Sequence, residues 1–179
     1  LSHLKEASFQ IWNNLPQLSY LQNLTDLSLK LRVDKSLKLS ESQVNNLCIG
    51  DLTQLKALRI GIHSEANLDK IIEKILTETQ KLSGLELLMI RYLNRSATLN
   101  KNLLVKLSKV LNSNQHLNTL EFNINLLLTE KPFSNQDLLV LGNSISSLKE
   151  LKYLCLLLGN LEVDQQTNLK VWEGVMALP

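Results

Sequence analysis

The sequence predicts an α/β fold in which short units, each a strand followed by a helix, stack around one curved parallel sheet. An apolar frame recurs at nearly constant spacing, its last part alternates with a period of two, and the intervening segments have the period of a helix. Because one unit cannot bury its apolar face alone, the strands must line up with the helices over one side. The predicted fold is a solenoid with the sheet on its concave side and the helices on its convex side.

The frame is apolar-x-x-apolar-x-x-apolar-x-apolar-x-apolar. Five copies occur, beginning at Leu21, Leu52, Leu82, Asn114 and Leu148. Their alternating cores are 31, 30, 32 and 34 residues apart and begin at Leu27, Leu58, Leu88, Leu120 and Leu154. A weaker copy precedes them by 20 residues and places Ala7, Phe9 and Ile11 in the three core positions. Residues 1–179 are therefore predicted to form a single solenoid of five to six units.

Helices are predicted between the cores. Apolar residues at helical spacing form two clear sets, Leu68, Ile71, Ile72, Ile75 and Leu76, and Leu99, Leu103, Leu104, Leu107, Val110 and Leu111. Start signals agree: residues 40–43 fit a capping box, Ser134 is placed to cap a helix through Leu138 and Ile145, and Asn67 or Ser64 could open the helix of the second unit. A last helix is predicted through Leu169, Trp172, Val175 and Met176.

Neither end of the sequence carries a polar capping unit, which a solenoid needs in order to stay soluble. The chain starts at Leu1 without a methionine and stops at Pro179, after the last predicted helix. We therefore expect these residues to be a fragment of a longer chain, and to associate through their terminal units when expressed alone.

Composition excludes several classes of protein. Nineteen basic and seventeen acidic residues leave a net charge of +2, too small to indicate nucleic acid or an anionic membrane, and no apolar run approaches the ~18 residues of a membrane span. Cys48 and Cys155 lie about three strand spacings apart, beyond the reach of a disulfide, so we expect free thiols and a reducing, cytoplasmic compartment. Sequons at Asn23 and Asn94 are interpreted as chance occurrences.

No catalytic, cofactor or metal site is predicted. His3, His63 and His116 lie far apart and have no ligand-spaced cysteine or carboxylate, and phosphate-binding and nucleophile-elbow motifs do not occur in the sequence. The carboxylate pairs Glu65 with Asp69 and Glu73 with Glu78 share a helix with several lysines, which is typical of a solvated outer face.

The remaining candidate for function is the set of side chains that point outward from the strands. If Leu27 and its equivalents point inward, the alternate residues form columns on the concave face. The candidate partner-binding residues are Lys30, Arg59, Met89, Arg91, Glu121, Asn123, Tyr153 and Leu157. The early units carry basic residues and the later units carry apolar residues on this face, which suits a protein partner that is partly acidic and partly hydrophobic. Alternatively, the apolar residues pack on a neighbouring domain.

The repeated L-x-x-L-x-L, as in Leu24-x-x-Leu27-x-Leu29, resembles the leucine-rich repeat superfamily over nearly the whole chain. The unit length resembles its ribonuclease-inhibitor-like subclass, and the Asn- and Lys-rich composition is similar to many ciliate leucine-rich-repeat proteins. One departure concerns the position after each core where the superfamily usually places Asn or Cys, occupied here by Arg32, His63, Leu93, Asn125 and Gly159. We therefore expect irregular turns after the strands.

The resemblance implies a non-catalytic protein–protein interaction scaffold. The chain would be a segment of a subunit in a larger cytoplasmic assembly. Composition alone suggests that this assembly is ciliary. The partner is expected to be another protein, with no small-molecule substrate, cofactor or membrane. A regulatory adaptor, either a small-GTPase regulator or a ubiquitin-ligase substrate receptor, is the alternative. Nucleic-acid binding is the weakest hypothesis, because only Lys30, Arg59 and Arg91 support it and no aromatic residues alternate with them.

Overall fold

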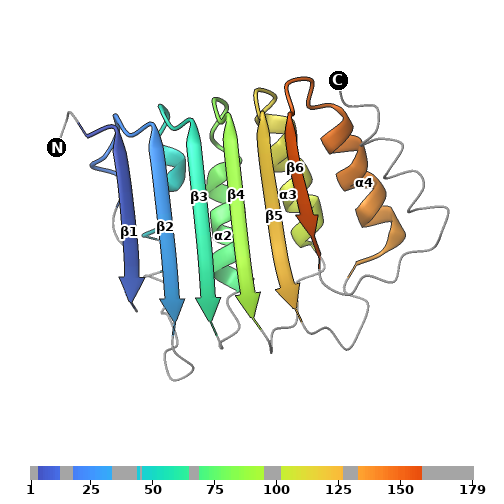
Figure 1. The fold of residues 1–179 in the computed structure, drawn as a ribbon, viewed down its shortest axis with the longest axis horizontal. Helices are drawn as coiled ribbons and strands as arrows, with labels where there is room; N and C mark the ends of the chain where they lie inside the picture. Colours follow the sequence, from blue (N-terminus) through green and yellow to red (C-terminus); the bar gives the residue numbers. More distant parts are fainter. Residues whose placement is uncertain are drawn as a thin grey trace.

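A six-stranded parallel sheet, in chain order, forms the centre of the computed structural model (Figure 1). The structure describes residues 4–12, 18–33, 44, 46–64, 69–94, 102–126 and 133–158. The strands are β1 (Glu6–Trp12), β2 (Asp26–Val33), β3 (Ala57–Ser64), β4 (Leu87–Asn94), β5 (Thr119–Leu126) and β6 (Tyr153–Leu157). Each strand pairs only with its neighbours in sequence, as the repeated frame predicts.

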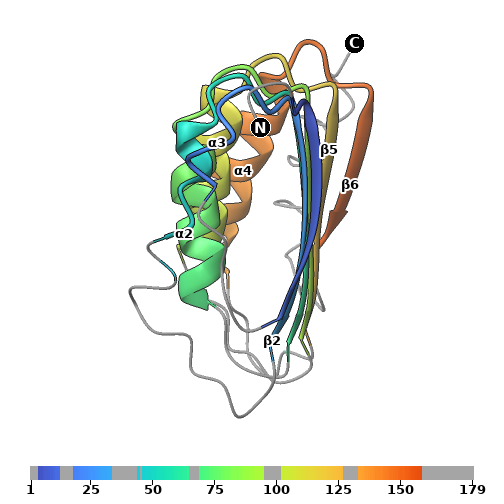
Figure 2. The ribbon, with the colours of Figure 1, turned by 90° about the vertical axis from the view of Figure 1, so that its left-hand side faces the viewer.

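Helices lie on one face of this sheet (Figure 2). They are α2 (Asp69–Thr79), α3 (Leu103–Ser113), α4 (Asn135–Ser146) and the short 3₁₀ helix η1 (Ile49–Asp51). The predicted alternation of strand and helix is confirmed from β3 to β6, whereas η1 is the helix described between β2 and β3. The capping box at residues 40–43, Asn67 and the helix predicted after residue 168 fall outside the described residues.

Two predicted helix starts can be judged. Ser134 caps α4 as predicted: its Oγ accepts the Asp137 N–H at 3.2 Å, and the Asp137 carboxylate accepts the Ser134 N–H at 2.9 Å. The alternative start at Ser64 is wrong, because Ser64 is the last residue of β3 and its backbone takes part in the strand pairing. α2 begins five residues later, at Asp69, so Ser64 does not open it.

The five core leucines lie in one register row. Leu27 pairs with Leu58, and the row continues through Leu88, Leu120 and Leu154. The first four are fully buried, and the same inward side carries Ile60, Ile90 and Phe122 in the next row. Burial of such side chains contributes about 1.5–3 kcal/mol each, so the core between sheet and helices is the main source of stability.

The chain enters the strands through tight turns at the frame leucines. Before β3 the Leu52 N–H donates to the Ile49 carbonyl at 3.0 Å, and the Leu55 N–H donates to the Leu52 carbonyl at 2.9 Å. Equivalent pairs of turns precede β2, β5 and β6. The fixed spacing of the frame therefore corresponds to a fixed backbone path into the sheet.

Neighbouring units are also joined by a repeated backbone contact just before each strand. The Thr25 carbonyl accepts two N–H groups of the next unit, from Lys56 at 2.8 Å and from Ala57 at 3.0 Å. The same double contact is made by the carbonyls of Lys5, Lys56, Glu86 and Asn118. Because the repeated donors and acceptors are backbone atoms, this contact depends little on the side chains, although proline would remove a donor. At the Lys5 carbonyl the Thr25 hydroxyl adds a further hydrogen bond at 3.0 Å.

Four of the five positions where the superfamily usually has Asn or Cys lie inside the strands, and the fifth, Gly159, falls outside the described residues. Arg32 pairs in register with His63, His63 with Leu93, and Leu93 with Asn125. The backbone groups of these residues are therefore hydrogen-bonded by strand pairing, so no side chain is needed to satisfy them. The turns beyond them fall outside the described residues.

Candidate functional site

One face of the sheet is covered by no helix in the described part of the chain (Figure 2). We call this the open face and define it by three columns of outward strand residues. Its three columns are Glu6, Asp26, Ala57, Leu87, Thr119 and Tyr153; Ser8, Ser28, Arg59, Met89, Glu121 and Cys155; and Gln10, Lys30, Gly61, Arg91, Asn123 and Leu157. All eight candidate partner-binding residues lie in these columns, so their predicted placement is confirmed.

The expected basic region is largely neutralised by ion pairs within the open face. Arg59 Nη1 donates to both carboxylate oxygens of Asp26, at 2.5 and 2.6 Å, and Arg91 forms a two-point pair with Glu121. Lys30 is exposed. The sequence predicted a basic region here, but the stacking brings carboxylates of neighbouring units beside Arg59 and Arg91.

The pair between Arg91 and Glu121 is asymmetric in exposure. The Glu121 side chain is 5% exposed and that of Arg91 is 58% exposed, so Glu121 is not the accessible contact residue that the outward register suggested. Arg91 donates from Nε and, at 2.8 Å, from Nη2, and these hydrogen bonds to Glu121 raise the pKa of the guanidinium. A guanidinium held at two points is fixed in orientation and keeps three of its five N–H donors for other acceptors.

Apolar side chains are uncovered at the β6 side of the open face. Tyr153 is 51% exposed and Leu157 is 53% exposed, and they rank among the few large hydrophobic residues exposed in the described chain. Leu87, Met89 and Cys155, also on the open face, are half-buried. An apolar surface of this kind on an ordered sheet is typical of an interaction site.

Asn123 lies between these apolar residues and the ion pair. It pairs in register with Arg91 on one side and with Leu157 on the other. Its Oδ1 is buried and has no hydrogen-bond partner, and it is the one such side-chain atom found among the described residues. Leaving a buried acceptor unsatisfied costs about 1–3 kcal/mol, so a rotation of the Asn123 side chain that brought Oδ1 to a donor would lower the free energy.

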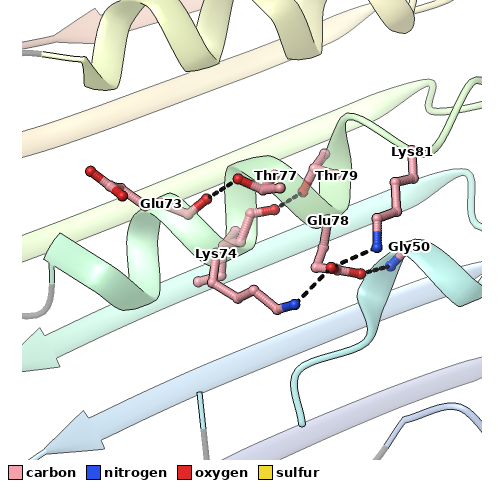
Figure 3. A network of polar contacts seen from close by, with 8 residues as sticks. Gly50, Glu73, Lys74, Thr77, Glu78, Thr79 and Lys81 are labelled. Carbon is pink, nitrogen blue, oxygen red and sulfur yellow. Dashed lines mark hydrogen bonds and ion pairs between the residues drawn. The ribbon is translucent and has the colours of Figure 1, made fainter. Parts of the chain in front are cut away.

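On the helical side, Glu78 corrects another sequence-based expectation. The lysine-rich pattern predicted a solvated carboxylate, but the Glu78 side chain is 2% exposed (Figure 3). Lys74 and Lys81 donate from Nζ to its Oε1 at 2.9 and 2.8 Å, and the Gly50 N–H donates to Oε2 at 3.2 Å. Glu78 therefore joins α2 to η1, whose approach the charge pattern of α2 alone could not show.

Gly50 is required by this close approach. A Cβ at this position would lie 2.9 Å from Glu78 Oε2 and 3.0 Å from the Glu78 carbonyl oxygen. Such distances are shorter than ordinary carbon contacts, and a backbone atom cannot give way cheaply. Any larger residue would therefore separate η1 from the end of α2.

We expect Glu78→Gln to lower the free energy of unfolding by about 1–2 kcal/mol at neutral pH, near the low end for charged hydrogen bonds because Lys81 is partly solvated. Burial alone would raise the pKa of Glu78, but hydrogen bonds from Lys81, Lys74 and Gly50 outweigh it and hold the pKa below 4.5. Because the pKa of Glu78 is lower in the folded state, its ionisation stabilises the protein at pH values above the unfolded-state pKa. This stabilisation is lost as the pH falls through the folded-state pKa.

Urea unfolding of both proteins between pH 7 and pH 3 measures this effect. Wild type should lose stability more steeply than the variant below about pH 4.5, so the two curves converge in acid. Parallel curves would contradict the role given to Glu78. Lys70→Gln, an exposed change on the same helix, is the control and should follow wild type.

Asn114 is a structural residue that the sequence analysis left without a role. It replaces the leucine that begins the other four copies of the frame, yet it is fully buried. Its Nδ2 donates to the Val110 carbonyl at 2.9 Å, and its Oδ1 accepts the Leu85 N–H of the preceding unit at 3.3 Å. The signal was the break in the leucine column, because a buried amide is retained where backbone groups need it.

The described residues offer no group suited to metal binding or a disulfide. No cluster of three His, Cys, Asp or Glu side chains occurs in them, and His63 and His116 are exposed. Cys48 and Cys155 lie in different units and form no disulfide. No helix in the described part of the chain is long and apolar enough to cross a membrane.

Compared with known proteins, the sequence matches no family model and no curated protein. The class of protein that the fold and the open face define is one of mixed α/β architecture with a six-stranded parallel sheet and helices on one side.

Proposed function

We propose that the chain is a solenoid of the leucine-rich repeat superfamily, close to its ribonuclease-inhibitor-like subclass. Support comes from the five copies of the frame and from the row of core leucines that they place in register. The double backbone contact at every junction adds support, since it repeats once in each unit.

The proposed function is that of a non-catalytic protein–protein interaction scaffold whose contact surface is the open face. The observation that carries this proposal is the exposure of Tyr153 and Leu157 on a sheet face that no described helix covers. Partner binding would remove these apolar surfaces from water at little entropic cost, because the strands already hold them in place. A cytoplasmic assembly is the setting that the resemblance suggests, and composition alone suggests a ciliary one.

The alternatives gain less support. Nucleic-acid binding needs free cations that can neutralise phosphates, and two of the three basic residues that suggested it, Arg59 and Arg91, are bonded to carboxylates. A regulatory adaptor would use the same kind of protein contact, and no specific observation on the open face favours it over a scaffold.

The experiment is capture of a stoichiometric partner by the tagged full chain from its native source, followed by comparison of two variants. Leu157→Asp places a charge on the open face and should weaken partner binding by ~10-fold or more. Lys109→Glu changes an exposed residue of α3 on the helical face and should leave binding unchanged. The reverse pattern, or a partner that proves to be RNA, would contradict the proposal.

A further inference from the structure

The half of the open face formed by β4, β5 and β6 is electrically neutral. We call its nine outward residues the neutral block: Leu87, Met89, Arg91, Thr119, Glu121, Asn123, Tyr153, Cys155 and Leu157. Its only charged side chains, Arg91 and Glu121, neutralise each other. A charged partner segment would lose its hydration there without gaining an opposite free charge, so charge complementarity favours an uncharged one.

The hydrogen-bonding groups of the neutral block match those of a peptide backbone. Asn123 Oδ1 lacks a donor, and Arg91 keeps N–H donors that Glu121 does not use. A backbone peptide group carries one donor and one acceptor, which is the combination these two neighbours can satisfy. Arg91 and Asn123 are in register on adjacent strands, which places them about 4.8 Å apart.

The apolar residues of the block set the length of the segment. Tyr153 and Leu157 point outward from the same strand, four residues apart, and therefore about 13 Å apart at ~3.3 Å per residue. About four residues of an extended chain cover that span. Leu157 is in register with Asn123, so an apolar side chain seated there brings its own backbone close to the unsatisfied acceptor.

Building on the proposed function, we propose that the neutral block binds an uncharged, extended segment of a partner protein through its backbone and an apolar side chain. On binding, the Asn123 side chain rotates so that its Oδ1 accepts a backbone N–H of the segment. A carbonyl of the segment accepts from Arg91, and the apolar side chain packs on Tyr153 and Leu157. This differs from the sequence-based expectation of a partly acidic partner, because Glu121 already occupies the guanidinium of Arg91.

The test is selection of binders to the full chain from a display library of random linear peptides. The enriched peptides should be uncharged and rich in apolar residues. A synthetic peptide of the enriched sequence is then titrated against variants: Asn123→Val should raise Kd about 5- to 10-fold, and Leu157→Asp by ~10-fold. The control is Lys109→Ala, at an exposed residue of α3 on the helical face, which should change Kd by less than about twofold.

A second measurement separates a binding role for Asn123 from a structural one. Removal of a buried acceptor without a partner should raise the Tm of the free protein, by about 2 °C, while weakening peptide binding. A lower Tm with unchanged Kd would overturn the proposal.

Two other outcomes of the selection would also overturn it. One is enrichment of acidic peptides whose binding depends on Lys30, and the other is enrichment of no peptide. In either case capture of a folded partner that is sensitive to Leu157→Asp would leave the proposed function standing.

Discussion

Phe122→Ala is expected to lower the free energy of unfolding by about 3–5 kcal/mol, among the largest effects of any single substitution here. Phe122 is fully buried and lies in register between Ile90 and Leu156, at the centre of the apolar layer beneath the helices. Truncation removes an aromatic side chain and leaves a cavity that the neighbouring strands cannot fill without losing their pairing. Urea unfolding followed by circular dichroism measures the change.

Tyr153→Ala is the matched control. Tyr153 is an aromatic residue on the adjacent strand, but it points to the open face and is 51% exposed. Its loss should change stability by no more than about 0.5 kcal/mol. Equal effects of the two substitutions would contradict the assignment of one buried and one open face to the sheet.

Asn114→Ala should have the second-largest effect, a loss of about 2–4 kcal/mol. The substitution leaves the buried Leu85 N–H and the Val110 carbonyl without the amide that now bonds them. Because Leu85 belongs to the preceding unit, the loss should weaken the junction between two units. Hydrogen exchange of the Leu85 amide, compared between wild type and variant, localises the effect.

Gln115→Ala provides the comparison for Asn114. Its Nε2 donates to the Leu111 carbonyl at 3.2 Å, so it is also an amide that bonds the end of α3, but it is exposed. Water can replace that contact, so we expect a change within about 0.5 kcal/mol. A Gln115 effect as large as that of Asn114 would show that burial and the link to Leu85 do not matter.

The sequence predicted the sheet in detail because the frame carries its own register. A constant spacing between cores places Leu27, Leu58 and Leu88 on adjacent strands, and the period of two then decides which neighbours point outward. Even the weak first copy follows the rule, since Ala7 pairs with Leu27. Placement of the candidate residues followed from the same argument.

Contacts between side chains of different units could not be predicted in this way. Asp26 and Arg59 lie 33 residues apart and occupy different columns, and their pairing depends on side-chain rotamers rather than on the repeat. Burial of Glu78 likewise depends on η1, which interrupts the regular pattern of units. Such pairs are decided by packing, so the charge of the open face had to be read from the structure.

Contacts between leucine methyl groups, measured by nuclear Overhauser spectroscopy on methyl-labelled protein, test the central claim most directly. The claim is that successive units place equivalent residues side by side, which creates both the core and the open face. We predict cross-peaks between Leu27 and Leu58, Leu58 and Leu88, Leu88 and Leu120, and Leu120 and Leu154. Cross-peaks that skip a unit, with none between sequential ones, would contradict it.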